Sequence, residues 1–151
     1  MHVNPSLNCK TCAEKIEGCH NSLRLWFEII SDNFKDCHVA VGFRGEADQE
    51  AAVAAGLSHA VWGKSKHNYM EDGKPSSWAI DIFQLGEDGK AHFEPSYFEN
   101  IWGFIKKLQD DAGDQDLTWG GLFHTLKDLD HFEMIKAEVI KQIQDLASGG
   151  C

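Results

Sequence analysis

The sequence has no run of about 18 consecutive apolar residues, the length that a membrane-spanning helix needs. Residues 1–10 also lack a basic stretch followed by an apolar core, so we expect neither a secretory signal peptide nor membrane insertion. Basic residues are scarce, since 14 Lys and Arg stand against 24 Asp and Glu and give a formal net charge of −10. This balance argues against binding to nucleic acid and against charge-driven binding to an anionic membrane surface.

The sequence also lacks the short motifs of several common enzyme classes. It contains no HExxH, GxSxG, P-loop or GxGxxG pattern. These absences argue against the common zinc-protease helix, the α/β-hydrolase nucleophile, and the usual nucleotide-binding loops. Catalysis by a cysteine–histidine pair stays open.

The five cysteines are an odd number in a chain without an expected signal peptide, which favours reduced thiols. Cys9 and Cys12, followed by Cys19-His20, have the side-chain types of a structural zinc site, but no second matching pair is present. Cys12, Ile16 and Cys19 would share one face of a helix. A packed helix with buried thiols is therefore favoured over zinc or a disulfide.

The overall composition is that of a folded globular protein. Its 151 residues are 42% hydrophobic, enough for a single domain with a real core. Apolar residues at spacings of three and four predict helices over 22–34, 47–55, 95–108 and 136–147, with Ser22 as the first helix cap and Gly56 as a stop. Alternating residues predict strands over 37–43, 78–85, 90–93 and 131–135.

Polar connecting segments complete this prediction, a long loop over 58–77 and an acidic connector over 110–116. Loops as long as the first are usually functional or mobile. The adjacent Gly120 and Gly121 suggest close backbone approach or a special turn. The order of elements predicts an α+β fold, a small, mostly antiparallel sheet with helices packed on it.

Three side chains stand out as candidate metal ligands. His67 lies in the polar loop, and Asp81 shares a strand face with apolar residues, where a carboxylate must be paired or hold a metal. His131 lies in a short strand between acidic residues. Two imidazoles and one carboxylate are a common ligand set for catalytic zinc. A rival set is His124, Asp128 and His131, which would share one face of a helix.

Five short motifs occur in one order along the chain: Gly42-Phe43-Arg44 with Gln49 downstream, Ser65-x-His67, Ala79-Ile80-Asp81, Trp119-Gly120-Gly121, and Asp128-x-x-His131-Phe132-Glu133. In this order they resemble the zinc D-alanyl-D-alanine carboxypeptidases and L-alanyl-D-glutamate endopeptidases. That family has a hedgehog/DD-peptidase-like fold and is common among phage endolysins. The resemblance spans about residues 39–135.

The resemblance implies that His67, Asp81 and His131 hold Zn²⁺. The spacing departs from the family, because thirteen residues, 68–80, separate His67 from Asp81, where about six are usual. We interpret the extra residues as an insertion in a loop at the rim of the site. Glu71 and Asp72, within it, are the alternative carboxylate ligands.

The remaining site residues also follow from the resemblance. Asp128 matches the catalytic base, with Asp130 or Glu133 as the next candidates. Arg44 matches an arginine that contacts the substrate or the developing oxyanion. Three further positions match residues near the site and are predicted to bind substrate together with Arg44: Gln49, Ser65 and Trp119.

The function implied by the resemblance is a zinc metallopeptidase that hydrolyses the stem peptide of peptidoglycan and lyses the cell wall, as a phage endolysin does. The scissile bond is either L-alanyl-D-glutamate or D-alanyl-D-alanine. One peptidase domain is expected, with a helical region over 1–36, a catalytic core over 37–135, and a C-terminal helix and tail over 136–151. A monomer is expected, made in the host bacterial cytoplasm and acting at the wall after the membrane opens. The alternatives are a non-catalytic, zinc-stabilised binding module and a cellular D-Ala-D-Ala dipeptidase.

Overall fold

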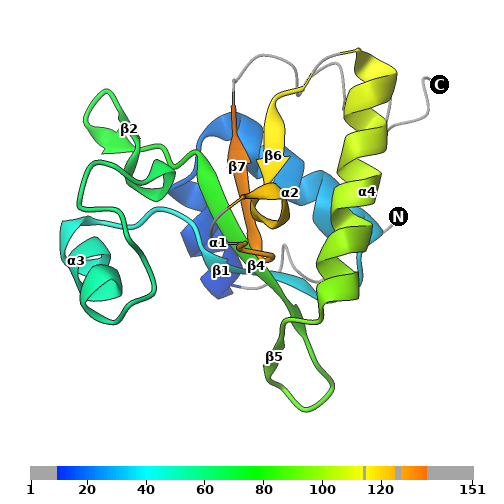
Figure 1. Ribbon diagram of the computed structural model, residues 1–151, viewed down its shortest axis with the longest axis horizontal. Helices are drawn as coiled ribbons and strands as arrows, with labels where there is room; N and C mark the ends of the chain where they lie inside the picture. Colours follow the sequence, from blue (N-terminus) through cyan, green and yellow to red (C-terminus); the bar gives the residue numbers. More distant parts are fainter. Residues whose placement is uncertain (1–9, 114, 125–126, 136–151) are drawn as a thin grey trace.

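The computed structural model describes residues 10–113, 115–124 and 127–135, which form an antiparallel sheet with helices packed around it (Figure 1). The predicted helix over 136–147 lies outside the described residues, as do Cys9 and Cys151. No described helix is both long and apolar enough to cross a bilayer. The predicted α+β class with an antiparallel sheet is confirmed.

The main sheet has five strands, four of them in the order β1-β4-β7-β6, while β5 pairs with β4. Their bounds are Cys37–Val41 for β1, Ala79–Leu85 for β4, Ala91–His92 for β5, Leu117–Trp119 for β6 and His131–Met134 for β7. Every pairing in the sheet is antiparallel. The four predicted strands are present in shorter form. Strand β6 was not predicted, because three residues are too few to show a clear alternation.

Four helices are described: α1 over Lys10–Glu17, α2 over Asn21–Asn33, α3 over Glu46–Ala54 and α4 over Pro95–Ala112. The predicted cap of α2 is wrong, because the ring Nδ1 of His20 accepts the hydrogen bond from Ser22 N at 3.1 Å. The acidic connector also begins later than predicted. Helix α4 continues to Ala112 and ends at Gly113, whose φ of 74° suits a residue without a side chain.

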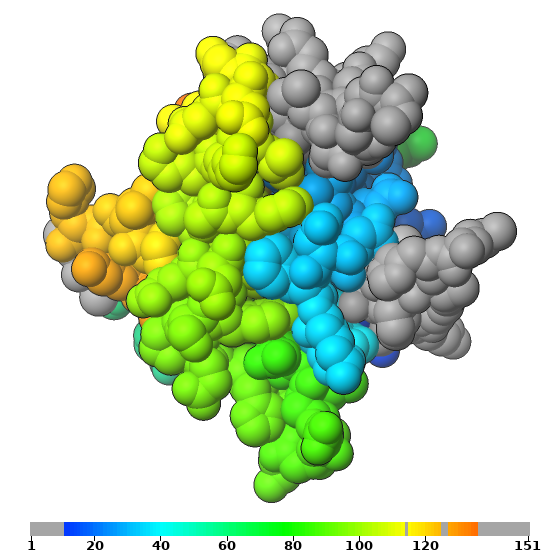
Figure 2. All heavy atoms as spheres, turned by 90° about the vertical axis from the view of Figure 1, so that its right-hand side faces the viewer, coloured from blue at the N-terminus to red at the C-terminus, as the bar shows by residue number. Residues whose placement is uncertain are grey.

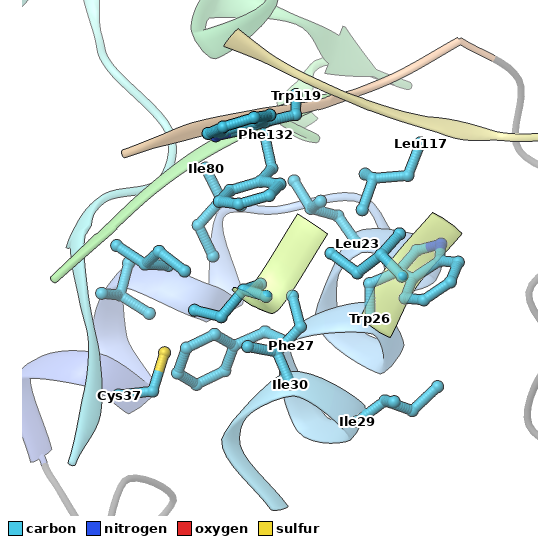
Figure 3. Close-up of a cluster of buried hydrophobic side chains, with 14 of the residues drawn as sticks. Leu23, Trp26, Phe27, Ile29, Ile30, Cys37, Ile80, Leu117, Trp119 and Phe132 are labelled. Carbon is cyan, nitrogen blue, oxygen red and sulfur yellow. The ribbon is translucent and has the colours of Figure 1, made fainter. Parts of the chain in front are cut away.

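The core lies between the sheet and helices α2 and α4, whose surfaces lie side by side in Figure 2. Figure 3 shows apolar side chains of α2, including Trp26 and Phe27, packed near Ile80 and Phe132 of the sheet. Successive strand residues point to opposite faces. The inward positions of Ile80 and Phe132 therefore leave Asp81 and His131 on the sheet face that lies away from this core.

The predicted loop over 58–77 contains more regular structure than expected. It holds a 3₁₀ turn, η1, over Lys66–Asn68 and a hairpin of β2 (Met70–Glu71) and β3 (Lys74–Pro75), labelled in Figure 1 by β2. The hairpin turn has positive φ angles of 52° at Asp72 and 75° at Gly73. An Asp-Gly pair with this backbone favours a two-residue hairpin connection.

Three of the cysteines lie within the described residues, and all three are buried: Cys12, Cys19 and Cys37. Burial raises the pKa of the Cys19 thiol to about 12, and burial likewise raises that of Cys37 to about 12. Among the residues that the structure describes, no cysteine belongs to a group of clustered metal-ligand atoms. The burial of Cys12 and Cys19 fits the interpretation as packed thiols, while the role of Cys9 stays a prediction.

The buried thiols lead to a prediction that a thiol titration checks. In a variant with Cys9→Ser and Cys151→Ser, we expect slow reaction with a disulfide reagent in the native protein, because only the rare thiolate reacts. Reaction of three thiols should become fast in denaturant. Rapid labelling of the native variant would contradict the burial of these side chains.

Candidate active site

Three side chains of metal-ligating types meet where two histidines approach the same oxygen of Asp81. Nε2 of His67 lies 3.4 Å and Nδ1 of His131 lies 2.9 Å from Asp81 Oδ1. Asp81 and His131 are direct neighbours in the β4–β7 pairing, which places their side chains together on one sheet face. His67 comes from η1, and its ring centroid is 5.2 Å from that of His131. The three predicted ligands are therefore brought together, with donor atoms within 4.8 Å of one another.

The other nitrogen of each histidine is bound to an acceptor in the chain. Nδ1 of His67 donates to the carbonyl of Gly42 at 2.8 Å, and Nε2 of His131 donates to Glu133 Oε1 at 3.0 Å. Metal-binding histidines typically donate their second N–H in this way, which fixes the ring and the tautomer. His67 Nε2 and His131 Nδ1 are consequently the nitrogens that face the shared centre.

Hydrogen bonds and opposite charges stabilise the ionised form of Asp81 and the protonated form of His131. Burial opposes ionisation of Asp81, but the hydrogen bonds from His131 and His67 outweigh burial and hold its pKa below the usual range. Burial likewise opposes protonation of His131, yet its bonds to Asp81 and Glu133 raise the pKa to about 10. Without a metal, protons thus supply the positive charge that Asp81 requires. A divalent cation can replace them, since metal binding displaces ligand protons.

Asp128 lies beside the three ligands and is half-exposed, with Oδ2 4.0 Å from His131 Nδ1. Its backbone is held by Gly120, whose carbonyl accepts from Asp128 N at 3.0 Å, and by His131 N, which donates to Asp128 O at 3.2 Å. A Cβ at Gly120 would overlap the Asp128 carbonyl. The predicted close approach at the paired glycines is therefore present, and it fixes the segment that carries Asp128.

Substitution at Gly120 checks this close approach. We expect Gly120→Ala to lower the free energy of unfolding by about 1–3 kcal/mol, because the Asp128 backbone must move. Gly103 is the matched control, since it lies within α4 with open space around its Cβ position. There, Gly→Ala should stabilise by about 0.5–1 kcal/mol. Urea unfolding measures both; equal shifts would contradict the packing described at Gly120.

A cleft of about 460 Å³ opens over the ligands. Its walls come from β4, β7, η1, the segments before and after α3, and the segment before β7, with these lining residues: Arg44, Gly56, Leu57, Ser58, His59, Ser65, His67, Asp81, Phe123, Lys127, Asp128 and His131. A larger hollow of about 690 Å³ lies beside α1 and contains none of the three ligands. The chemistry of the side chains, not the size of the hollow, marks the first as the candidate site.

Arg44 lines the cleft and is held there by hydrogen bonds at its backbone and at its guanidinium group. Its backbone N donates to His67 O at 2.9 Å, and its Nη1 donates to Gln49 Oε1 at 3.2 Å. Gln49 is fully buried, and its amide also bonds Asn68, Ser58 and Ala60. This network holds Gln49 in a supporting position behind Arg44.

Ser65 and Trp119 are also tied to the site framework. Ser65 lines the cleft, and its hydroxyl accepts from His67 N at 3.2 Å, which caps η1. Trp119 is buried, stacks near Phe132, and donates from Nε1 to Leu129 O at 2.7 Å. Both therefore position segments that carry site residues. Substrate contact by these residues, and by Gln49, stays a prediction.

In the part of the chain that the structure describes, the alternative ligands His124, Glu71 and Asp72 do not cluster with the three predicted ligands. Within the described residues, His124 is exposed, and neither it nor Glu71 nor Asp72 belongs to a group of clustered ligand atoms. A second acidic group joins Asp81, Asp128 and Asp130. Burial, together with the neighbouring Asp128, raises the Asp130 pKa to about 8, so this group resists full ionisation.

The fold of the chain is similar to that of a solved peptidase structure. The chain matches the crystal structure of Serratia marcescens L-Ala D-Glu endopeptidase ChiX with a TM-score of 0.64 and 25% sequence identity. The match covers 83% of this chain and 86% of ChiX. No protein-family model and no curated protein sequence matches the chain. The chain therefore has the α+β fold of a peptidase.

Two supporting residues, Lys66 and Glu133, were not predicted to contact each other. Glu133 bonds the outer face of His131, and Lys66 Nζ lies 2.7 Å from Glu133 Oε2. From the sequence, Glu133 is predicted as part of a motif and as an alternative base, and no role is assigned to Lys66. The two residues are far apart in the chain, so no local spacing could reveal their pairing. Gly42 was noticed only as part of a motif, although its carbonyl orients His67.

Proposed function

We propose that this chain is a zinc-dependent peptidase that hydrolyses the peptide of peptidoglycan. The observation that carries the proposal is the convergence of His67 Nε2 and His131 Nδ1 on Asp81, with both outer nitrogens already bonded. The likeness to ChiX, an L-Ala D-Glu endopeptidase, supports the substrate class and favours that bond over D-alanyl-D-alanine.

The donor set fits zinc better than a hard cation. Two imidazole nitrogens and one carboxylate oxygen are usual zinc ligands, whereas calcium and magnesium prefer oxygen alone. Catalytic zinc sites have three protein ligands, and three side chains of suitable type cluster here. When bound, zinc supplies a Lewis acid that lowers the pKa of water to about 7.

Asp128 is proposed as the general base. Its half-exposed carboxylate lines the cleft beside His131 and can take the proton of the attacking water. The same group then delivers that proton to the leaving amine as the peptide bond breaks. Glu133 is a poor alternative, because its two oxygens are engaged by His131 and Lys66.

Arg44 is proposed to bind the negative charge that develops on the substrate carbonyl, or a substrate carboxylate. Its guanidinium is steadied by Gln49, so little reorganisation is needed during reaction. Lys127 adds a second cationic side chain to the cleft wall. Cations in this cleft stand out in a chain of net charge −10 and suit an anionic peptide.

The biological setting we propose is that of a phage endolysin acting as a monomer. The ordered motifs support this role. In that setting the chain is made in the host cytoplasm and reaches the wall after the membrane is opened.

The deciding experiment is mass spectrometry of purified peptidoglycan digested with the zinc-loaded chain, with and without a chelator. New peptide ends between L-Ala and D-Glu that vanish with chelator would establish the proposed reaction. Loss of single alanines would instead indicate a carboxypeptidase. An unchanged digest from folded, zinc-loaded protein would overturn the proposal in favour of a binding module, and cleavage of free D-Ala-D-Ala alone would indicate the dipeptidase.

A further inference from the structure

Glu133 lies directly behind the ligand His131. The two residues are next-but-one neighbours on β7 and share its outward face, where Glu133 is paired with Ala79 on one side and Thr118 on the other. Its Oε1 lies 3.0 Å from His131 Nε2, and its side chain is only 18% exposed. An ionised carboxylate can accept hydrogen bonds but cannot donate them, so Nε2 must carry the proton in this contact. Nδ1 is thereby turned toward Asp81.

Lys66 binds the other carboxylate oxygen of Glu133. Its Nζ lies 2.7 Å from Glu133 Oε2 and donates to the Met134 carbonyl at 2.7 Å. Its own carbonyl accepts from Trp78 N at 3.0 Å, which ties the Lys66 backbone to the start of β4. The lysine therefore has fixed partners at both its backbone and its side chain.

The position of Lys66 links two metal ligands. It immediately precedes His67 in η1, and through Glu133 it reaches His131 on β7. A displacement of Lys66 would therefore disturb the backbone of one ligand and the orientation of the other. Ion pairs on exposed surfaces contribute little, but this pair is largely enclosed and also bonded to the backbone.

We infer that Lys66 and Glu133 are positioning residues for the metal ligand His131, and that the charged Lys66–Glu133 pair sets the affinity of the site for zinc. The inference rests on the proposed function and extends it to two residues outside the ligand set. Glu133 holds the His131 ring and its tautomer, while Lys66 holds Glu133 and balances its charge. Such supporting contacts commonly change metal affinity by about 10–100-fold.

The test measures zinc affinity of the full chain by competition with a chromophoric chelator. Glu133→Leu should weaken zinc binding by about 10–100-fold, because the His131 ring loses its acceptor. Glu133→Gln should recover most of that loss, since its amide oxygen can still accept from Nε2. Lys66→Met should weaken binding while leaving the Glu133 contact to His131 possible.

The control is Lys106→Met, which breaks an exposed Lys106–Asp110 pair on α4 and should leave zinc affinity unchanged. Circular dichroism of each metal-free variant checks that it folds. Zinc affinity of Glu133→Leu equal to that of a zinc-binding wild type would overturn the inference alone. If Glu133→Leu fails to fold, Lys66→Met decides in its place: weakened binding supports the inference and unchanged binding overturns it. A folded wild type that binds no zinc would overturn the proposed function and the inference together.

Discussion

Replacement of Asp128 by asparagine is expected to lower peptide hydrolysis by about 10²–10⁴-fold while zinc stays bound. Asparagine keeps the shape of the side chain but cannot take a proton at neutral pH. Asp128 is not one of the three converging ligands, so its loss leaves the donor set intact. The result would separate proton transfer from metal binding, which no ligand substitution can do.

The measurement pairs the rate of peptidoglycan digestion with the zinc content of the same sample. Asp110→Asn is a suitable control, because Asp110 is an exposed aspartate on α4 that bonds only Lys106 among the ion pairs described. It should digest at the wild-type rate. Near-normal turnover of Asp128→Asn would show that the base is elsewhere, and Asp130, with its raised pKa, would be the next residue to replace.

Replacement of Asp81 by asparagine is expected to remove both zinc and activity. Asp81 Oδ1 is the atom toward which both histidines point, and its negative charge is lost in the variant. Because loss of a supporting contact alone costs about 10–100-fold, loss of this ligand should lower zinc affinity by more than about 100-fold. Chelator competition and digestion assays measure the two effects.

Asp72→Asn is the matched control for this substitution. Asp72 is exposed in the hairpin turn at a φ of 52°, and asparagine tolerates that conformation. This variant should bind zinc as the wild type does. If instead Asp72→Asn lost zinc and Asp81→Asn kept it, the carboxylate ligand would lie in the inserted segment and the assignment of Asp81 would be wrong.

Much of the framework could be predicted because its signals are local. Apolar residues at spacings of three and four mark α2 and α4, and alternation along β4 separates Ile80 from Asp81. That alternation also identified Asp81 as a carboxylate needing a partner. The structure places His131 beside it and His67 within reach, as the ordered motifs indicated.

The features that were not predicted share a physical cause. Their contacts join segments that are distant in the sequence, or involve side chains that are unusual in that role. The cap of α2 is a histidine ring, a group rarely considered for that position. The enclosure of Gln49 depends on bonds to Arg44, Ser58, Ala60 and Asn68. The Lys66–Glu133 pair forms only when η1 packs against β7. The Asp72-Gly73 turn is the exception, because an Asp-Gly dipeptide is a local signal of a hairpin turn.

The hairpin of β2 and β3 closes on itself before the chain reaches Asp81. Ser76 N donates to the Tyr69 carbonyl at 2.9 Å, and Trp78 N donates to Lys66 O at 3.0 Å, so the two ends of the excursion are fastened together. The thirteen residues between His67 and Asp81 therefore add length to the chain without adding distance between the ligands. Sequence searches for sites of this kind should leave the gap between the first histidine and the aspartate unrestricted, because a fixed spacing would overlook chains built like this one.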